Sequence, residues 1–275
     1  MKNCNVIAIT NQKGGVGKTT TTVNLGVGLV KAGKRVLLID ADPQGSLTLS
    51  LGVKSPDDLE VSLATHMSNI MQERPFDPHI GIMKHEEGID FLPSNIELSG
   101  VEISLFNAMS REYVLKSYVD SVRKDYDYIL IDGMPSLGMM AINTLVAADS
   151  VIIPSQPSFL SAKGLDLLLH SVMKVKRSIN PKLKITGILL TMVDNRTNNA
   201  KDITRSLQVS IGQHVRIMRT QIPFSVRAAE CCLHGKSIFS YDKSGKVTAG
   251  YEGLTKEVIQ LEREKANRSR NDGAR

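Results

Sequence analysis

The chain alternates short, continuously apolar runs with longer stretches in which apolar residues recur at helical spacing. The apolar runs predict buried strands at 6–9, 35–39, 89–92, 126–132, 149–154, 183–192 and 215–222. The helical spacing predicts helices over 20–31, 57–71, 96–109, 112–124, 137–148, 159–177 and 248–265. No internal repeat, low-complexity linker or domain boundary interrupts the pattern. We therefore expect one α/β domain over residues 1–266, followed by a polar tail at 267–275.

A glycine-rich loop joins the first apolar run to the first helical stretch. It consists of Gly14, Gly15, Val16 and Gly17, followed by Lys18, Thr19 and Thr20. Glycines allow successive N–H groups to converge on an anion, and the N-terminus of the following helix adds positive potential. We expect Lys18 to contact the β- and γ-phosphates of a nucleotide, and the Thr19 hydroxyl to ligate Mg²⁺.

Two apolar runs end in aspartates that belong at the same edge of the sheet as this loop. Asp42 follows the run 35–39, and Asp132 ends the run 126–132. The carboxyl ends of strands in an α/β sheet are where ligands bind. We therefore expect Asp132 to hold Mg²⁺ through water, and Asp42 to orient water near the γ-phosphate and to contribute to the metal site. Asp42 is also well placed to start a Pro-Gln-Gly turn.

The base side of the nucleotide site is expected at the ends of the last two strands. Met192 and Asp194 follow the run 183–192, and the turn after the last run adds Pro223, Phe224 and Val226.

Basic residues are concentrated in one part of the chain. Residues 173–227 hold eleven Lys or Arg and two Asp, a net charge of +9, whereas the whole chain carries +6 and the remainder therefore −3. A segment that exceeds the charge of the whole protein favours an anionic partner.

The cysteines and the N-terminus narrow the class of protein. Cys4 stands alone and Cys231 and Cys232 are adjacent, so neither a disulfide framework nor a zinc spacing is present. The first apolar run is too short for a signal peptide or a membrane span. We expect a cytoplasmic protein with buried or inactive thiols.

Taken together, these motifs resemble those of ParA/Soj-type partition ATPases, and the likeness covers nearly the whole chain. The loop lacks the usual P-loop glycine, having Gln12 instead, and carries a second lysine, Lys13; this KGGVGKT form is the deviant Walker A loop of the ParA/MinD group. The stretches that carry the resemblance are 11–26, 40–48, 125–132, 135–138, 191–198, 222–230 and 235–238. The segment 161–165 suggests the branch found on plasmids and conjugative elements. Met134 and the Cys231-Cys232 pair depart from many relatives.

The resemblance implies a doubly wound, mostly parallel sheet with helices on both faces. It also implies MgATP as cofactor, an ATP-dependent sandwich homodimer, non-specific binding of double-stranded DNA, and hydrolysis stimulated by a ParB-like centromere-binding partner on the nucleoid. In this family the residue matching Lys13 reaches the partner's phosphates. Residues expected on the DNA-binding face are Arg196 and Arg227, with Lys201, Arg205, Arg216 and Arg219 as further contributors.

Two alternatives remain at this point. A MinD-like ATPase that cycles on and off membranes would need an amphipathic C-terminal helix with basic residues, but here Glu257, Glu262 and Glu264 lie among the lysines. A reductase of the nitrogenase iron-protein type would need paired cysteines at the dimer axis, and the cysteines lie elsewhere. We therefore expect no membrane partner.

Overall fold

A central eight-stranded sheet organises the computed structural model, which describes residues 4–194 and 215–272. The strands are β1 (Asn5–Ile9), β2 (Val36–Ala41), β3 (Met83–Lys84), β4 (Asp90–Leu92), β5 (Tyr128–Gly133), β6 (Ser150–Ser155), β7 (Lys184–Val193) and β8 (Ile217–Pro223). Their order across the sheet is β3-β4-β2-β5-β1-β6-β7-β8. All neighbouring pairs are parallel except β3 with β4, so the expected doubly wound, mostly parallel fold is confirmed.

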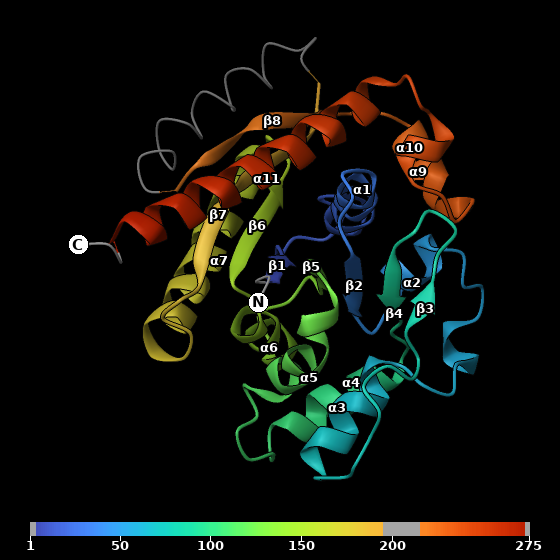
Figure 1. The fold of residues 1–275 in the computed structure, drawn as a ribbon, viewed down its shortest axis with the longest axis vertical. Helices are drawn as coiled ribbons and strands as arrows, with labels where there is room; N and C mark the ends of the chain where they lie inside the picture. The colour runs from blue at the N-terminus through green and yellow to red at the C-terminus, as the bar shows by residue number, and fades with distance from the viewer. Residues whose placement is uncertain (1–3, 195–214, 273–275) are drawn as a thin grey trace.

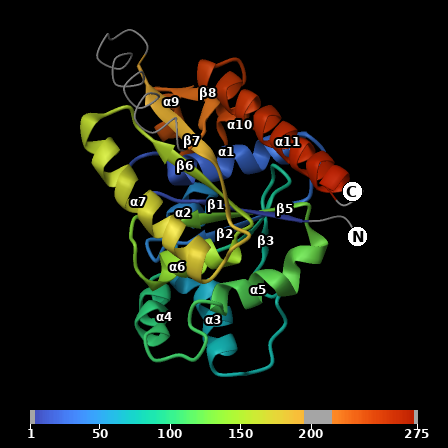
Figure 2. The same ribbon diagram turned by 90° about the vertical axis from the view of Figure 1, so that its left-hand side faces the viewer.

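Helices cover both faces of the sheet (Figures 1 and 2). They are α1 (Lys18–Lys31), α2 (Ser46–Ser50), α3 (Leu63–Met71), α4 (Glu97–Leu105), α5 (Val114–Val122), α6 (Met139–Ala147), α7 (Phe159–Ser178), α9 (Arg227–Leu233), α10 (Ile238–Tyr241) and α11 (Lys246–Asp272), with 3₁₀ turns at Pro56–Asp58 and Arg123–Asp125. Figure 2 shows α3 to α6 on one side of the strands, with α1 and α11 on the other. No helix in the described part of the chain is long and apolar enough to span a bilayer.

Two hydrophobic cores result, because successive side chains of a strand point to opposite faces. In β1, Val6 and Ala8 belong to the core beneath α3 to α7, whereas Ile7 and Ile9 belong to the core beneath α1 and α11. Strands buried on both faces read as continuous apolar runs, which is why the sequence pattern located them.

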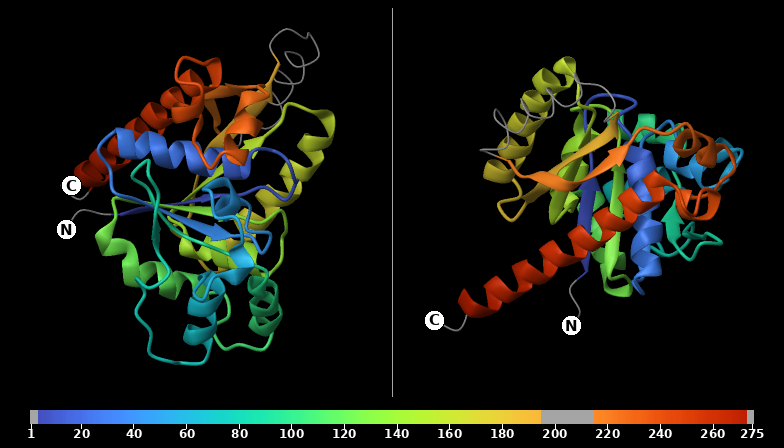
Figure 3. Two further views of the ribbon diagram at one scale, coloured as in Figure 1. Left: turned by 90° about the vertical axis from the view of Figure 1, so that its right-hand side faces the viewer. Right: turned by 90° about the horizontal axis from the view of Figure 1, so that it is seen from above.

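The C-terminal helix α11 lies across the sheet against α1 and β8. Leu254 and Val258 are fully buried in the core that α1 covers. The approach to α1 is close: a Cβ added at Gly28 would lie 2.2 Å from the Thr255 hydroxyl oxygen. The apolar stripe of α11 therefore docks onto the body of the protein, and its C-terminal end extends beyond the sheet (Figure 3, right).

Several boundaries differ from the sequence-based expectation. The helix expected over 57–71 begins at Leu63, because Ser62 and Thr65 form a capping box there: Ser62 Oγ accepts from the Ala64 N–H at 3.2 Å, and Thr65 Oγ1 accepts from the Ser62 N–H at 3.1 Å. The helix expected over 96–109 ends at Leu105, and α11 continues to Asp272 instead of ending near 265. Sequence periodicity missed β3, α2, α9 and α10, which are too short to show a period.

Candidate functional site

The glycine loop crosses the carboxyl edge of the sheet between β1 and α1. Gly15 and Gly17 have φ of 69° and 81°, values that side-chain-bearing residues rarely adopt. Within the described residues, the backbone N–H groups of Gly14 to Thr19 donate to no acceptor. The Lys18 side chain is buried, and its amine donates to the carbonyl of Lys13 at 3.3 Å. Burial lowers the pKa of Lys18, and the nearby Asp132 and Asp42 carboxylates oppose that shift. The result is a run of N–H donors without an acceptor in the described residues, with an ammonium group beside it.

Side chains from other strands hold the carbonyl groups of this loop. Thr191 Oγ1 donates to the Val16 carbonyl at 2.8 Å, and Gln156 Nε2 donates to the Gly15 carbonyl at 3.1 Å. Gln12, which replaces the usual glycine, donates from Nε2 to the Gly164 carbonyl at 2.6 Å. The Gly15 and Val16 carbonyls thus accept hydrogen bonds from Gln156 and Thr191 rather than from N–H groups of the loop itself. Those N–H groups can therefore donate to a ligand. Sequence reasoning missed these supports, since they join segments far apart in the chain.

Asp132 connects β5 to the first turn of α1. Its two carboxylate oxygens accept from the Thr19 hydroxyl at 2.7 Å and from the Thr22 hydroxyl at 3.0 Å. Burial raises the pKa of Asp132 to about 6, and the bonds from Thr19 and Thr22 together with the charge of Lys18 oppose that rise. The predicted partners Thr19 and Asp132 are therefore in contact. Thr22 was missed, although its position one helical turn after Thr19 puts it on the same face.

Asp42 lies in the loop after β2 and is largely buried. Its Oδ1 accepts from the Gln44 N–H at 3.0 Å, and its carbonyl accepts from the Gly45 N–H at 2.9 Å. It therefore forms the turn considered from the sequence, while standing at the same sheet edge as the glycine loop. Asp40, which the sequence analysis did not single out, is in register with Asp132 on the neighbouring strand. Burial, and to a lesser degree the Asp132 carboxylate, raise the pKa of Asp40 to about 7.

A small apolar pocket of about 120 Å³ adjoins the glycine loop where a base would lie. Its lining includes five of the predicted residues, Gly17, Thr20, Met192, Pro223 and Phe224, and also Thr191, Ile222, Ser225, Ala228, Ala229 and Tyr251. The predicted Asp194 and Val226 do not line it. Met192 has a positive φ of 53°, a strained conformation for such a residue. The residues contributed by α9 and α11 could not be found from the sequence, because their proximity depends on the tertiary packing.

The Lys13 side chain contacts the start of α7. Its amine lies 3.4 Å from the Ser158 hydroxyl, at the start of α7. A Cβ added to the adjacent Gly14 would meet no atom of its own chain within 4 Å.

The predicted DNA-binding residues fall into two groups. Arg196, Lys201 and Arg205 lie outside the described residues. Arg219 is exposed on the edge strand β8, and Arg216 is exposed directly before that strand; both lie beside a groove of about 280 Å³ that β8 forms with α11. Glu257 of α11 accepts the N–H groups of Arg219 and Thr220, both at 2.9 Å, and so covers part of this edge.

Arg227 lies at the start of α9 and pairs with Asp242 at 2.8 Å, with 63% of its side chain exposed.

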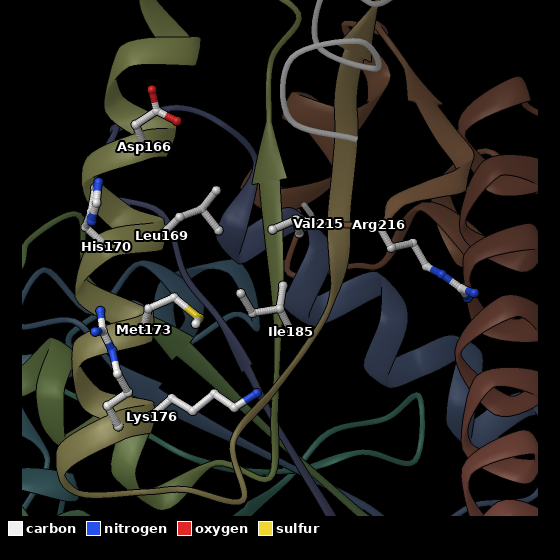
Figure 4. A pocket seen from close by; sticks show the side chains of 9 residues that line it. Asp166, Leu169, His170, Met173, Lys176, Ile185, Val215 and Arg216 are labelled. Carbon is white, nitrogen blue, oxygen red and sulfur yellow. The ribbon is translucent and has the colours of Figure 1, made fainter. Parts of the chain in front are cut away.

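A second groove, of about 590 Å³, lies between α7 and β7. Figure 4 shows Leu169 and Met173 facing Ile185 across it, while Arg216 points away towards α11. Apolar and charged side chains therefore line this groove together, because Lys176 and Arg177 of α7 also belong to its lining.

The residues at the sheet edge fit a magnesium-bound nucleoside triphosphate. Unpaired N–H groups and an ammonium group suit phosphate oxygens. A hydroxyl and a carboxylate, already in contact at Thr19 and Asp132, are the oxygen ligands that Mg²⁺ prefers. Together with the parallel sheet, this arrangement defines a P-loop nucleotide-binding protein.

Comparison with known proteins narrows the class. A family model described as "AAA domain" matches residues 4–185. The chain is 43% identical over 255 residues to the sporulation initiation inhibitor protein Soj of Bacillus subtilis, covering 92% of this chain and 97% of Soj. It is 37% identical over 262 residues to the chromosome partitioning protein ParA of Caulobacter vibrioides, covering 94% and 96%. The chain therefore belongs to the AAA-domain ATPases of the ParA/Soj type, as the sequence motifs predicted.

A solved structure of the same fold contains bound ligands. Cobyrinic acid a,c-diamide synthase from Mycobacterium smegmatis, with bound ATP analogue and magnesium, superposes with a TM-score of 0.83 at 33% identity, covering 94% of each chain. The expected cofactors, ATP and Mg²⁺, agree with that complex.

Proposed function

We propose that this protein is an ATP-dependent DNA partition ATPase, which dimerises on ATP, binds DNA without sequence preference and hydrolyses ATP when a ParB-like partner stimulates it. The observation that carries the proposal is the row of unpaired N–H groups from Gly14 to Thr19, next to the Thr19–Asp132 contact. This edge of the sheet is arranged to bind a triphosphate and a divalent cation together.

Each residue of the site has a separate task in this mechanism. The loop N–H groups and Lys18 bind the phosphates and stabilise the charge that develops on them during transfer. Thr19, with its hydroxyl, and Asp132, with its carboxylate, would hold the magnesium ion. Bound Mg²⁺ supplies charge neutralisation at the β- and γ-phosphates. Asp42 orients the attacking water and accepts its proton.

The dimer is supported by what surrounds Lys13 and Gly14. The Lys13 amine donates to the Ser158 hydroxyl at the start of α7, and we infer that in the dimer it contacts the phosphates of a facing protomer, as a basic group supplied in trans. Gly14 leaves open space at the loop surface, which permits two backbones to approach face to face.

DNA binding is supported by the basic segment 173–227. Arg216, Arg219 and Arg227 are exposed in the part of that segment that the structure describes. Neutralising phosphates releases counterions, so binding is steeply salt-dependent and independent of sequence. A dimer doubles the number of contacts, which makes binding depend on ATP. The protein then acts in the cytoplasm, on the nucleoid.

The structure does not favour the two alternative functions. A MinD-like membrane helix needs an apolar face free to enter a bilayer, whereas Leu254 and Val258 of α11 are buried. An iron–sulfur cluster within one chain is ruled out for Cys4 and Cys231, because they lie in the cores on opposite faces of the sheet.

The experiment that tests the proposal compares four proteins for ATP affinity and for hydrolysis with and without DNA and partner. Wild type is expected to bind and hydrolyse ATP. Lys18→Ala loses binding, and Asp42→Ala binds ATP but hydrolyses it very slowly and accumulates as dimer. Lys31→Ala is the matched control, because Lys31 is an exposed lysine at the other end of the same helix. Wild-type turnover by Asp42→Ala would refute the assignment of Asp42.

A further inference from the structure

Asp40 is a fully buried carboxylate that no lysine or arginine of the described residues pairs with. Three donors surround it instead. Its Oδ1 accepts from the Asp42 N–H at 3.2 Å, and its Oδ2 accepts from the Thr48 N–H at 2.9 Å and the Thr48 hydroxyl at 2.7 Å. Burying an acid costs free energy unless its oxygens accept hydrogen bonds. Here all three bonds come from residues 42–48, the segment that directly follows β2.

Thr48 extends this network to a third segment. Its hydroxyl donates to Asp40 and accepts from the Ser94 N–H at 3.0 Å. Thr48 lies in α2, and Ser94 lies in the loop after β4. Because a hydroxyl can donate and accept at once, this one group ties the ends of β2 and β4 to α2. None of these bonds involves a residue of the glycine loop.

We propose that Asp40 and Thr48 are positioning residues for hydrolysis, which hold the backbone of Asp42 so that its carboxylate stays at the phosphate edge of the sheet. This inference rests on the proposed role of Asp42. Asp42 lies in the loop after β2, so the position of its side chain depends on how its backbone is held. Asp40 supplies that anchor from within the rigid sheet, and Thr48 fixes the orientation of the Asp40 carboxylate. Small misplacements of a reacting group are expensive in rate.

The test uses substitutions that change the hydroxyl and little else. Thr48→Val keeps the shape and removes the hydroxyl, and Thr48→Ser keeps the hydroxyl. Asp40→Asn is a second variant that keeps volume but gives up one accepting oxygen. Thr144→Val is the matched control, because the Thr144 hydroxyl is buried and has no partner among the described residues. The measurements are ATP affinity, the single-turnover hydrolysis rate and the hydrogen-exchange rate of the Asp42 amide.

Thr48→Val and Asp40→Asn are expected to lower the single-turnover rate about 10- to 100-fold, the range seen when outer-sphere partners of a reactive site are lost. ATP affinity stays unchanged, and Asp42 amide exchange becomes faster. Thr48→Ser restores the rate, and Thr144→Val matches wild type.

Two results would overturn the inference. One is a rate and an Asp42 exchange in Thr48→Val that equal those of Thr144→Val. The other is a loss of ATP affinity in proportion to the rate, which would indicate a general structural role. If wild-type protein hydrolysed no ATP, the proposed function would fail by itself. The exchange measurement would still decide whether Asp40 and Thr48 anchor Asp42.

Discussion

Replacing Thr22 with valine removes a hydrogen bond to the buried Asp132 carboxylate. Thr22 is fully buried, and its hydroxyl lies 3.0 Å from Asp132 Oδ1 and 3.1 Å from the Lys18 carbonyl. Valine has nearly the same shape, so no large cavity forms. What is lost is a donor to a buried acid whose pKa burial has already raised to about 6.

The magnitude depends on the charge of Asp132. A hydrogen bond to an ionised group contributes about 1.5–3 kcal/mol, and one between neutral groups about 1 kcal/mol. Asp132 is ionised at pH 8 and protonated at pH 5, since its pKa is about 6. Thr22→Val should therefore lower the free energy of unfolding by about 1.5–3 kcal/mol at pH 8 and by about 1 kcal/mol at pH 5. Without Thr22 the pKa of Asp132 rises further, so Mg²⁺ competes with a proton and binds about tenfold more weakly near neutral pH.

Urea unfolding at the two pH values measures the first effect, and calorimetric titration with MgATP measures the second. Thr186→Val serves as the control, because the buried Thr186 hydroxyl has no partner in the described part of the chain. Equal losses for Thr22→Val and Thr186→Val at pH 8 would show that the Thr22–Asp132 bond contributes nothing to stability.

Three further predictions concern the pH dependence, the dimer and the DNA. Burial raises the pKa of Asp40 to about 7, from an ordinary value near 3.8, so wild type loses stability as the pH rises between these values. Asp40→Asn has no such titration, so its free energy of unfolding should gain up to about 1.4 kcal/mol per pH unit relative to wild type. Parallel pH profiles of the two proteins in urea unfolding would contradict this. A Cβ added at Gly14 or at Gly100 meets no atom of its own chain within 4 Å. With a slowly hydrolysed ATP analogue, Gly14→Val should sediment as a monomer, because the valine blocks the approach of the second protomer. Gly100→Val is the control and should dimerise. Arg227→Ala should weaken DNA binding and reduce the slope of log affinity against log salt by about one unit, whereas Arg35→Ala, which removes another exposed, paired arginine, should leave the slope unchanged.

The strands other than β3, the glycine loop and the contact of Asp132 with that loop could be predicted because each is encoded locally. A strand buried on both faces is a continuous apolar run, and the loop's chemistry lies in consecutive residues from Gly14 to Thr19. The short elements β3, α2, α9 and α10 could not be predicted, because runs of two to seven residues contain less than a usable period. The start of α3 also escaped, since the Ser62–Thr65 capping box outweighed the apolar pattern before it.

What the sequence determines by itself is therefore the kind of site: a glycine loop suited to phosphate, followed by two acids at the ends of buried strands. The tertiary structure alone decides how that chemistry is held in place. Gln156 and Thr191 reach the loop carbonyls from the ends of β6 and β7, and Tyr251 reaches the base pocket from α11. Asp40 becomes an anchor only because α2 folds back over the end of β2 and lies beside the loop after β4. These contacts join residues far apart in the chain. Their energies depend on burial and on distances between atoms, and neither can be read from the order of residues in the sequence.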